Sequence, residues 1–389
     1  MAGPLSHLRV LDLSRVLAGP WATQTLADMG AEVVKVERPG LGDDTRGWGP
    51  PFIQAPDPET GRAGMAAYFT CANRGKRSVA IDFTTPEGAQ LVREMAASAD
   101  VVVENFKRGG LVKYGLDYES LKAVKPDLVY CSITGFGQTG PYADRAGYDA
   151  MIQAMGGLMS ITGQPDGEPG AEPMKVGVAV VDLFTGMYAA TGILAALAHR
   201  DRTGEGQWID LALLDVQVAM LANQAANFLA SGKAPGRMGN AHPNICPYQA
   251  FAAADGHLML AVGNDQQFRR FCAVAGREDL ADDPRFATNK KRVENRAVLV
   301  PLVRTLLAAR PRDEWIAGLE AAGVPCGPIN TIDQVFDHPQ VKARGMVVEA
   351  PLPDGTMVPM VANPLKFSAT PLGPWKAPPV MPVEHDGHD

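Results

Sequence analysis

The sequence predicts an α/β fold: a large domain built on a mainly parallel β-sheet, followed by a smaller α+β domain. The chain has 389 residues, enough for two domains of ordinary size, and apolar residues make up 46% of it, enough for a large core. Short apolar segments alternate with amphipathic ones in the N-terminal part of the chain. This alternation is typical of a parallel sheet covered by helices on both faces.

The predicted strands and helices of the large domain alternate along the chain: strands at 9–13, 32–36, 78–83, 101–104 and 128–134, and helices at 21–29, 86–97 and 118–124. Gly30 ends the first helix, and Thr85 and Pro86 supply an N-cap hydroxyl and a first-turn proline to the second. Ligands of such sheets bind beyond the carboxyl ends of the strands. We therefore expect the site in the loops that follow these strands.

The second half of the chain is more helical, with predicted helices at 179–202, 211–230, 266–275, 292–309 and 312–322. A short extended piece precedes the helix at 211–230. Residues 248–261 read as a hairpin that turns at Asp255 and Gly256. These signals predict a large domain at 1–225, to which 330–389 return, and a small domain at 226–329. The proline-rich tail from residue 350 is expected to pack on the large domain or on a partner subunit.

Composition excludes several classes of protein. The formal net charge is -7, so we expect no nucleic-acid partner. The five cysteines are scattered, without a C-x-x-C pair, which indicates a reduced, intracellular protein with no metal site. We expect a cytoplasmic location because the N-terminus shows no leader pattern. The apolar run at 176–198 contains Asp182, so it predicts a buried helix and no membrane span. The terminal His385 and His388 are assigned no function.

Two motifs lie in the loops after predicted strands. The segment Gly135–Gly140 matches G-x-G-x-x-G, but Pro141 follows it, and the second strand with an acidic end is absent, so we do not predict a dinucleotide site. Two basic clusters lie near other strands: Arg74, Lys76 and Arg77, and Lys107, Arg108 and Lys113. Each alone is typical of a solvated surface. If their strands are neighbours, they form a basic patch suited to the phosphates of a nucleotide.

Asp182 interrupts the apolar run GVAVVDLFTG close to the start of a predicted helix. From the residues alone, the simpler interpretation is an N-cap aspartate that accepts hydrogen bonds from free backbone amides. The alternative is a poorly hydrated carboxylate that acts as a nucleophile or base. The residues by themselves favour the N-cap.

Several segments together resemble the class III CoA-transferase family, which includes formyl-CoA transferase and carnitine CoA-transferases. The resemblance covers most of the chain, at residues 8–48, 73–83, 101–115, 133–150, 177–197 and 324–341. The segment at 241–268 is similar to the branch that contains succinate-hydroxymethylglutarate CoA-transferase, whose substrates are dicarboxylic acids. The resemblance implies a Rossmann-like large domain and an interlocked, ring-like homodimer.

The resemblance also implies site residues, and it reverses the preference at Asp182. The family's nucleophile is an aspartate in a segment that matches GVAVVDLFTG, which places it at Asp182. The residues expected to bind CoA are Arg15, Val16, Leu17, Ala18, Arg38, Arg74, Ile81, Asn105, Phe106 and Lys113. No cofactor is expected to be tightly bound, because the CoA thioester is itself a substrate. The glycine run that covers the site in formyl-CoA transferase has no counterpart near 242–248.

The predicted activity is transfer of CoA from an acyl-CoA donor, succinyl-CoA, to another carboxylic acid, a dicarboxylate, through an aspartyl anhydride and an aspartyl-CoA thioester. The candidates for contact with the acid are Arg46, Arg108, Tyr148 and His242. Two alternatives remain open. Racemases of α-methylacyl-CoA resemble the Asp182 segment, but they carry a histidine at the position of Tyr148, and proton exchange at carbon needs such a base. The other alternative is a non-catalytic CoA-binding protein.

Overall fold

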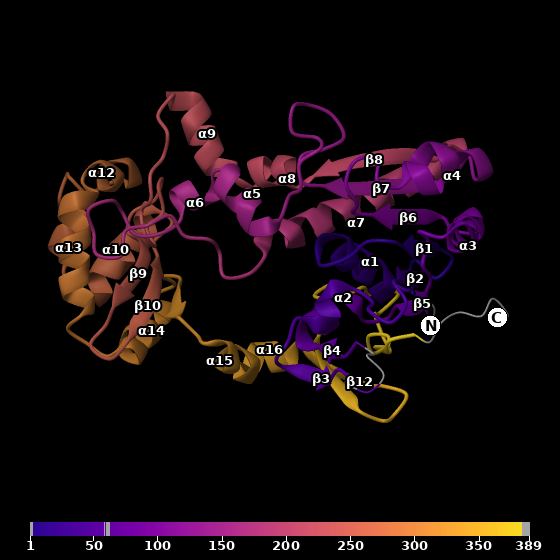
Figure 1. Cartoon of the computed structure of the whole chain (residues 1–389). Coiled ribbons are helices and arrows are strands. Elements are labelled where there is room, and N and C mark those ends of the chain that lie inside the picture. Colours follow the sequence, from indigo (N-terminus) through magenta and orange to yellow (C-terminus); the bar gives the residue numbers. More distant parts are fainter. Residues whose placement is uncertain (1–2, 58, 60–62, 383–389) are drawn as a thin grey trace. The chain divides into compact units, whose positions relative to one another are not determined.

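The computed structural model describes residues 3–57, 59 and 63–382, so the terminal histidines lie outside the described residues. The chain divides into two compact units (Figure 1). The first contains Met1–Gly157, Val176–Leu221 and Pro339–Asp389, and the second contains Leu158–Lys175 and Ala222–His338. This division differs from the prediction chiefly at 158–175, which were expected in the large domain and cluster with the second unit.

A six-stranded parallel sheet forms the centre of the first unit, in the order β5-β2-β1-β6-β7-β8. Its strands are β1 (Arg9–Asp12), β2 (Glu32–Glu37), β5 (Arg77–Ala80), β6 (Val101–Glu104), β7 (Val129–Thr134) and β8 (Gln207–Ala212). The chain runs from β1 outward to β5 and then crosses to β6 on the other side of β1. The strand order therefore reverses between β1 and β6, and such a reversal opens a crevice at the carboxyl ends of the strands.

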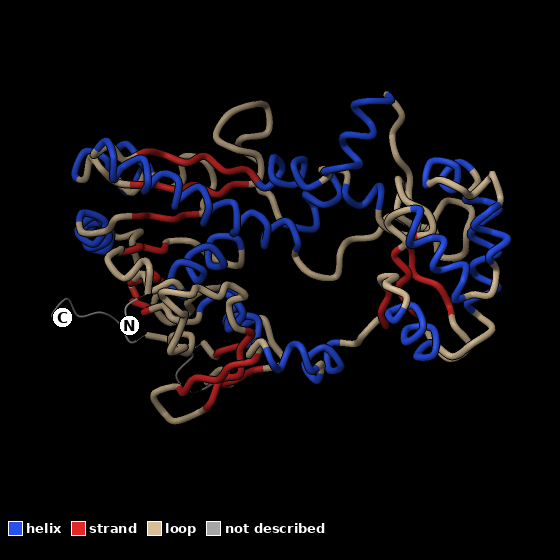
Figure 2. The backbone as a smooth tube through the Cα atoms, turned by 180° about the vertical axis from the view of Figure 1, so that it is seen from behind, coloured by secondary structure: helices blue, strands red, loops and turns tan. Residues whose placement is uncertain are grey.

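Helices cover both faces of this sheet (Figure 2). One face carries α1 (Ala18–Asp28), α5 (Asp149–Met155), α7 (Val180–Thr203) and α8 (Leu213–Met220), and the other carries α3 (Pro86–Ala97) and α4 (Tyr118–Val124). Val101 and Val103 belong to the first core and Val102 to the second, because successive strand residues point to opposite faces. The composition of α7 would allow a membrane span, but Ile193 of this helix is fully buried in the first core.

The local signals in the sequence explain where several elements begin and end. The Thr85 hydroxyl accepts a hydrogen bond from the Gly88 N–H at 3.0 Å, so α3 begins at the predicted cap. Gly204, with φ of 77°, ends α7. The predicted helix at 211–230 is wrong at its start, because residues 211 and 212 pair with β7 as the end of β8. It is also broken: α9 (Ala222–Ser231) is a separate helix, and its first residue has φ of 42°.

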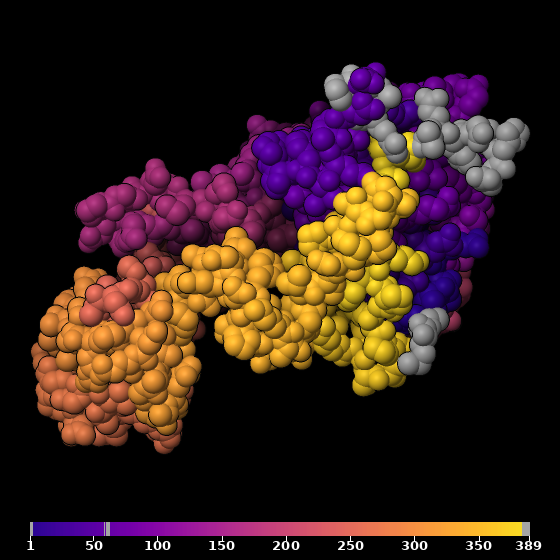
Figure 3. Space-filling view, turned by 90° about the horizontal axis from the view of Figure 1, so that it is seen from below, coloured from indigo at the N-terminus to yellow at the C-terminus, as the bar shows by residue number. Residues whose placement is uncertain are grey.

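The C-terminal residues return to the first unit, where Figure 3 shows them in yellow against residues from the start of the chain. The hairpin of β12 (Val347–Pro351) and β13 (Met357–Val361) packs on Met65 and Phe69 in a small core of its own. The remaining elements of this unit are β3 (Phe52–Gln54), β4 (Met65–Ala66), α2 (Ala67–Asn73), α16 (Pro339–Ala343) and two 3-10 helices, η1 (Asp44–Gly47) and η2 (Val112–Tyr114).

The second unit has an antiparallel sheet in the order β11 (Cys326–Pro328), β10 (His257–Ala261), β9 (Tyr248–Ala252), which confirms the predicted hairpin. Its other elements are α6 (Leu158–Ile161), α9, α10 (Asp265–Val274), α11 (Glu278–Asp282), α12 (Asn289–Glu294), α13 (Arg296–Leu307), α14 (Arg312–Ala321) and α15 (Ile332–Asp337). The helix predicted at 292–309 is interrupted at Asn295, whose side-chain amide donates to the carbonyl of Arg285.

Candidate active site

The loops that follow β1 and β6 leave the sheet where its strand order reverses, and they are tied to each other. The Asn105 side chain accepts a hydrogen bond from the Arg15 N–H at 2.8 Å and donates to the Arg15 carbonyl at 2.6 Å. The two loops therefore form one wall at the carboxyl ends of β1 and β6. This is the position at which ligands bind in sheets of this order.

Two adjoining cavities lie at this wall. One has a volume of about 410 Å³ and includes Asp182 in its lining, and we name it the Asp182 cavity. The other, of about 350 Å³, includes Arg38 and is named the Arg38 cavity. Arg15, Phe106 and Gly110 line both cavities. A long ligand can therefore extend from one cavity into the other past these three residues.

The Arg38 cavity combines apolar walls with cations. Leu13, Val36 and Ile81 belong to the buried core beneath it, and Phe83 packs edge-on against Phe106 with the ring centroids 5.6 Å apart. The cations in its lining include Arg15, Arg38 and Lys113. Apolar and aromatic surface suits a purine ring, and arginine and lysine suit phosphate groups.

Asp182 is the third residue of α7, and the N-cap position belongs to Ala179. The structure therefore corrects the N-cap interpretation. Asp149, at the start of α5, caps α7 instead, because its carboxylate accepts from the N–H groups of Val181 at 2.8 Å and Asp182 at 3.3 Å. Among the described residues, no hydrogen bond or ion pair engages the Asp182 carboxylate. The side chain remains available to the cavity.

The electrostatics of the site leave this carboxylate poorly stabilised as an anion. Partial burial, with the negative charge of Asp149 as a second cause, raises the pKa of Asp182 from 3.8 to about 7. The dipole of α7 opposes this effect, because the N-terminal end of a helix favours negative charge, but the N–H groups of Val181 and Asp182 are already bonded to Asp149. A carboxylate with little solvation is a stronger nucleophile than a solvated one.

Glycines place the residues around Tyr148 against the end of the sheet. A Cβ atom on Gly135 would lie 2.5 Å from the Cα atom of Gly147, so neither position has room for a side chain. This close contact fixes the backbone just before Tyr148 and Asp149. The G-x-G-x-x-G segment thus serves close packing, and no helix follows it directly.

The structure brings most of the predicted site residues to the two cavities. Val16, Leu17, Ala18, Asn105, Arg108 and Tyr148 line the Asp182 cavity, Arg38, Ile81 and Lys113 line the Arg38 cavity, and Arg15 and Phe106 line both. His242 belongs to the second unit, where its ring lies 5.2 Å from that of Tyr248 and its Nδ1 accepts from the Asn244 N–H at 3.1 Å.

Arg46 and Arg74 do not line either cavity, and this corrects the two predictions. The Arg46 guanidinium is 1% exposed and makes two hydrogen bonds of 2.7 Å to Glu37. Arg74 is also buried, with its Nε atom donating to Asp28 at 2.8 Å. Because their charges are already paired inside the protein, neither side chain is available to a phosphate or a substrate carboxylate.

Sequence reasoning missed three residues that shape the site. Asp149 caps α7, Arg145 lines the Asp182 cavity, and Asp43 accepts a hydrogen bond from the Val16 N–H. Arg145 and Asp149 lie within three residues of Tyr148, but Tyr148 was the candidate site residue named in that loop. The role of Asp43 depends on contacts between loops, for which the sequence carries no periodic signal.

Comparisons with known proteins agree with this geometry. The sequence model of CoA-transferase family III matches residues 5–385. A succinate–glutarate CoA-transferase of Agrobacterium fabrum is 57% identical over 369 residues, which cover 95% of this chain and 90% of that protein. A succinyl-CoA:glutarate CoA-transferase of Homo sapiens is 42% identical over 385 residues, which cover 99% of this chain and 85% of that protein.

A solved structure shows the same fold over almost the whole length. The crystal structure of a CaiB/BaiF family protein from Brucella suis has a TM-score of 0.84 and 55% sequence identity, covering 97% of this chain and 96% of that one. With a family match that spans nearly every residue, and an unengaged Asp182 carboxylate in a cavity that continues into a cationic one, the chain belongs to CoA-transferase family III.

Proposed function

We propose that this enzyme transfers CoA from succinyl-CoA to a second dicarboxylate, with Asp182 as the nucleophile. The observation that carries the proposal is the Asp182 carboxylate, which is partly buried, free of hydrogen bonds among the described residues and open to a cavity. The names of the relatives support the choice of acids, because they are a succinate–glutarate and a succinyl-CoA:glutarate CoA-transferase.

The two adjoining cavities suggest how an acyl-CoA lies. Its adenine ring and phosphates occupy the Arg38 cavity, with Arg15, Arg38 and Lys113 at the phosphates. Its pantetheine arm passes Phe106 and Gly110, and its thioester reaches Asp182 in the second cavity. Binding the nucleotide end in this way orients the thioester at the carboxylate, which lowers the entropic part of the barrier.

In the first half of the reaction, an Asp182 oxygen attacks the thioester carbonyl carbon. The carbon–sulfur bond breaks, CoA leaves as a thiolate, and a mixed anhydride joins Asp182 to the succinyl group. The thiolate then attacks the Asp182 carboxyl carbon. Succinate leaves with the bridging oxygen, and Asp182 becomes a CoA thioester.

The second half runs these two steps in reverse with the acceptor. The acceptor carboxylate attacks the aspartyl thioester carbon, the carbon–sulfur bond breaks to release the thiolate, and a second anhydride joins Asp182 to the acceptor. The thiolate then attacks the acceptor's acyl carbon, and the Asp182 carboxylate is regenerated. No net proton transfer or redox change occurs, so the residues need only bind, orient and stabilise charge.

Two helix N-termini at the Asp182 cavity suit this chemistry. Ala18 is the first residue of α1 and Asp182 lies in the first turn of α7, and both line the cavity. Negative charge is stabilised at helix N-termini, by about 0.3–1 kcal/mol at exposed positions and more when the site is partly buried. The thiolate and both carboxylates carry such charge at this point.

We assign the acceptor's distal carboxylate to Arg108 and Arg145. Both line the Asp182 cavity, and the Arg108 side chain is half-exposed, with a 3.4 Å contact to Asp144 as its one ion pair among the described residues. The Arg145 guanidinium lies over the Tyr142 ring, 4.3 Å from its centroid, so that ring orients it. An arginine matches a carboxylate with two parallel hydrogen bonds, which favours dicarboxylates over monocarboxylates.

We further propose a cytoplasmic homodimer. Phe184, Met187 and Tyr188 are exposed on α7, although Ala189 and Ile193 of the same helix are buried in the core, and a second copy of the chain would cover them. Mass photometry at nanomolar concentration tests this proposal. A clean monomer peak would contradict it.

The decisive experiment is a matrix of acyl-CoA donors against acids, read by mass spectrometry, with the Asp182→Asn variant beside the unaltered enzyme. We expect transfer from succinyl-CoA to dicarboxylates, reduced at least ~10³-fold in the variant, because a covalent route needs its nucleophile. Hydroxylamine added after succinyl-CoA should modify a peptide that contains Asp182. Near-normal transfer by a folded variant, or a label on Asp149, would refute the assignment. Solvent deuterium exchange at the α-carbon would instead support a racemase.

A further inference from the structure

Val16 has an unusual backbone conformation for its residue type. Its φ is 70°, in the left-handed region that a β-branched side chain rarely adopts. The residue lies in the loop after β1 and lines the Asp182 cavity, together with Arg15, Leu17 and Ala18. Conformations of this kind persist only where surrounding contacts hold them, and they are frequent at binding and catalytic sites.

Three side chains hold this loop, one at each of three consecutive residues. Lys35 donates from Nζ to the Ser14 carbonyl at 2.7 Å, and Asn105 bonds both the N–H and the carbonyl of Arg15. The Asp43 carboxylate accepts from the Val16 N–H, with its two oxygens 3.2 and 3.3 Å from the nitrogen. Of the three, only Asp43 bonds the residue with positive φ.

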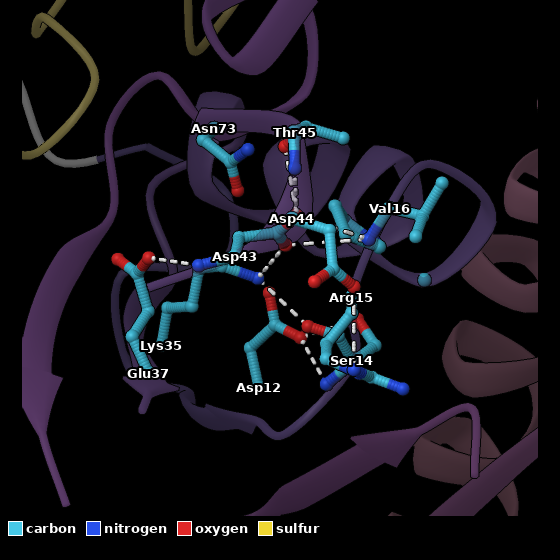
Figure 4. Close-up of polar contacts among 12 residues, drawn as sticks. Asp12, Ser14, Arg15, Val16, Lys35, Glu37, Asp43, Asp44, Thr45 and Asn73 are labelled. Atoms are coloured by element: carbon cyan, nitrogen blue, oxygen red, sulfur yellow. Dashed lines mark hydrogen bonds and ion pairs between the residues drawn. The ribbon is translucent and has the colours of Figure 1, made fainter. Parts of the chain in front are cut away.

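Asp43 is itself fixed in the interior. Figure 4 shows it between Lys35 and the loop, and its Oδ2 atom lies 2.9 Å from the Lys35 Nζ atom in a fully buried ion pair. Its carboxylate also accepts from the N–H and the hydroxyl of Thr45, at 3.0 and 2.7 Å. Its own N–H donates to Glu37 at 2.8 Å. These bonds leave Asp43 little freedom to follow Val16 if the loop changes conformation.

The charge of Asp43 persists despite its burial. Burial alone would favour the neutral acid, but the ammonium group of Lys35 and the Thr45 hydrogen bonds hold the pKa of Asp43 below its usual value. A buried ion pair with this many hydrogen bonds is costly to assemble and rarely adds to net stability. Its location directly beneath the loop suggests a use other than stability.

From these contacts we infer that Asp43, paired with Lys35, is a positioning residue that holds Val16 in the left-handed conformation and thereby sets the Arg15–Ala18 loop for the acyl-CoA. This inference rests on the proposed function. Asp43 does not line the Asp182 cavity, so it does not contact the reacting atoms. It does line the Arg38 cavity, but a contact with the nucleotide there would not depend on the residue at position 16, whereas an effect through the Val16 N–H would.

The inference makes a specific prediction about glycine at position 16. Glycine adopts positive φ about as readily as negative φ, so a loop with glycine there needs Asp43 less. In the natural background, Asp43→Asn should raise the Kd for free CoA and the KM for succinyl-CoA about tenfold, the size expected for a lost charge-assisted hydrogen bond. In the Val16→Gly background, the same substitution should raise them less than about threefold.

A matched control separates positioning from stability. Asp100 accepts from a backbone N–H, that of Arg9 at 2.8 Å, and pairs with Arg200 at 2.9 Å, so it resembles Asp43 in its partners. It lies just before β6, at the amino ends of the strands, whereas the Arg15–Ala18 loop lies at their carboxyl ends. Asp100→Asn should lower the melting temperature without changing the Kd for CoA, and glycine at position 16 should not alter its effect.

The experiment measures CoA binding by calorimetry, succinyl-CoA kinetics, and amide hydrogen exchange of the peptide containing Val16. We expect faster exchange of that peptide in Asp43→Asn and a rise in KM larger than any fall in kcat. If Asp43→Asn does not fold, Lys35→Met combined with Asp43→Asn removes both buried charges together. Because Lys35 also holds the Ser14 carbonyl, this double variant is compared with Lys35→Met alone, and the difference between the two reports on Asp43.

Equal effects of Asp43→Asn in the two backgrounds, with unchanged exchange at Val16, would overturn the inference while leaving the proposed function intact. Failure of the unaltered protein to bind CoA would overturn the proposed function and this inference with it.

Discussion

The pH dependence of the first half-reaction tests how Asp149 and Asp182 are coupled. The perturbation is Asp149→Asn. The Asp149 carboxylate accepts from the N–H groups of Val181 and Asp182 at 2.8 and 3.3 Å, and an asparagine oxygen can still accept from both. The substitution therefore retains the cap on α7 and removes the negative charge of Asp149. The charge of Asp149 is the second cause of the raised pKa of Asp182, after burial. Removing it should lower that pKa without returning it to 3.8.

The magnitude follows from the pKa of about 7 for Asp182. In the proposed mechanism only the ionised carboxylate attacks the thioester, so about half of the enzyme is expected to be competent at pH 7 and about a tenth at pH 6. If the substitution lowers the midpoint by about one pH unit, the competent share at pH 6 rises about fivefold, to roughly half. The rate relative to its own plateau should rise by the same factor.

The assay is single-turnover release of CoA thiol from succinyl-CoA between pH 5 and 9, with each profile scaled to its plateau. Scaling removes any change in the maximal rate that comes from altered geometry. Gln153 donates to Asp149 at 2.6 Å, so Gln153→Met serves as a control that disturbs the same helix without removing a charge. An unchanged midpoint in Asp149→Asn, or an equal shift in the control, would refute the coupling.

Three further outcomes are expected. Because the pKa of Asp182 is raised, ionising this side chain destabilises the folded state once the pH exceeds 3.8, and the full cost is reached above about 7. Asn at this position avoids the cost. The stability advantage of Asp182→Asn over the unaltered protein should therefore be larger at pH 8 than at pH 5, by about 1–2 kcal/mol. Denaturant melts at both pH values check this gain, and an equal difference at both would contradict it. Arg145→Ala should raise KM for glutarate about tenfold or more and leave KM for butyrate within twofold, whereas a parallel rise in both would remove Arg145 from the distal-carboxylate site. Arg46→Met leaves Glu37 buried without its partner and should lower the unfolding free energy by about 3–5 kcal/mol, measured by denaturant melts. A loss below about 1 kcal/mol would show that this ion pair does not stabilise the fold.

The strands of the sheet were predictable because burial on both faces leaves a continuous apolar run in the sequence. Residues 101–104 and 129–134 are buried at every position, and both segments were recognised. β8 was harder, since its polar, exposed Gln207 and Asp210 break the apolar run and a helix begins immediately after Ala212. Its strand character comes from pairing with β7, a contact that local sequence does not encode.

The site was predictable in part for a similar reason. Asp182 was visible because a carboxylate inside an apolar run is rare, but its cap lies 33 residues earlier, at Asp149. Arg46 was predicted as a candidate for contact with the acid because it is a cation, and only the fold shows that it pairs with Glu37 in the interior. Partners that come together through tertiary structure carry no signature in residue spacing.

Among the described lining residues the two cavities share Arg15, Phe106 and Gly110, and in the proposed binding mode this connection separates recognition of CoA from recognition of the acid. The nucleotide end would then make the same contacts whichever acyl group is attached, so we expect substitutions around Arg108 and Arg145 to change the acid accepted without weakening CoA binding. The separation also means that the nucleotide binds away from the reacting atoms. Binding energy gained there orients the thioester at Asp182, so a pantetheine thioester that lacks the nucleotide should lose turnover as well as affinity.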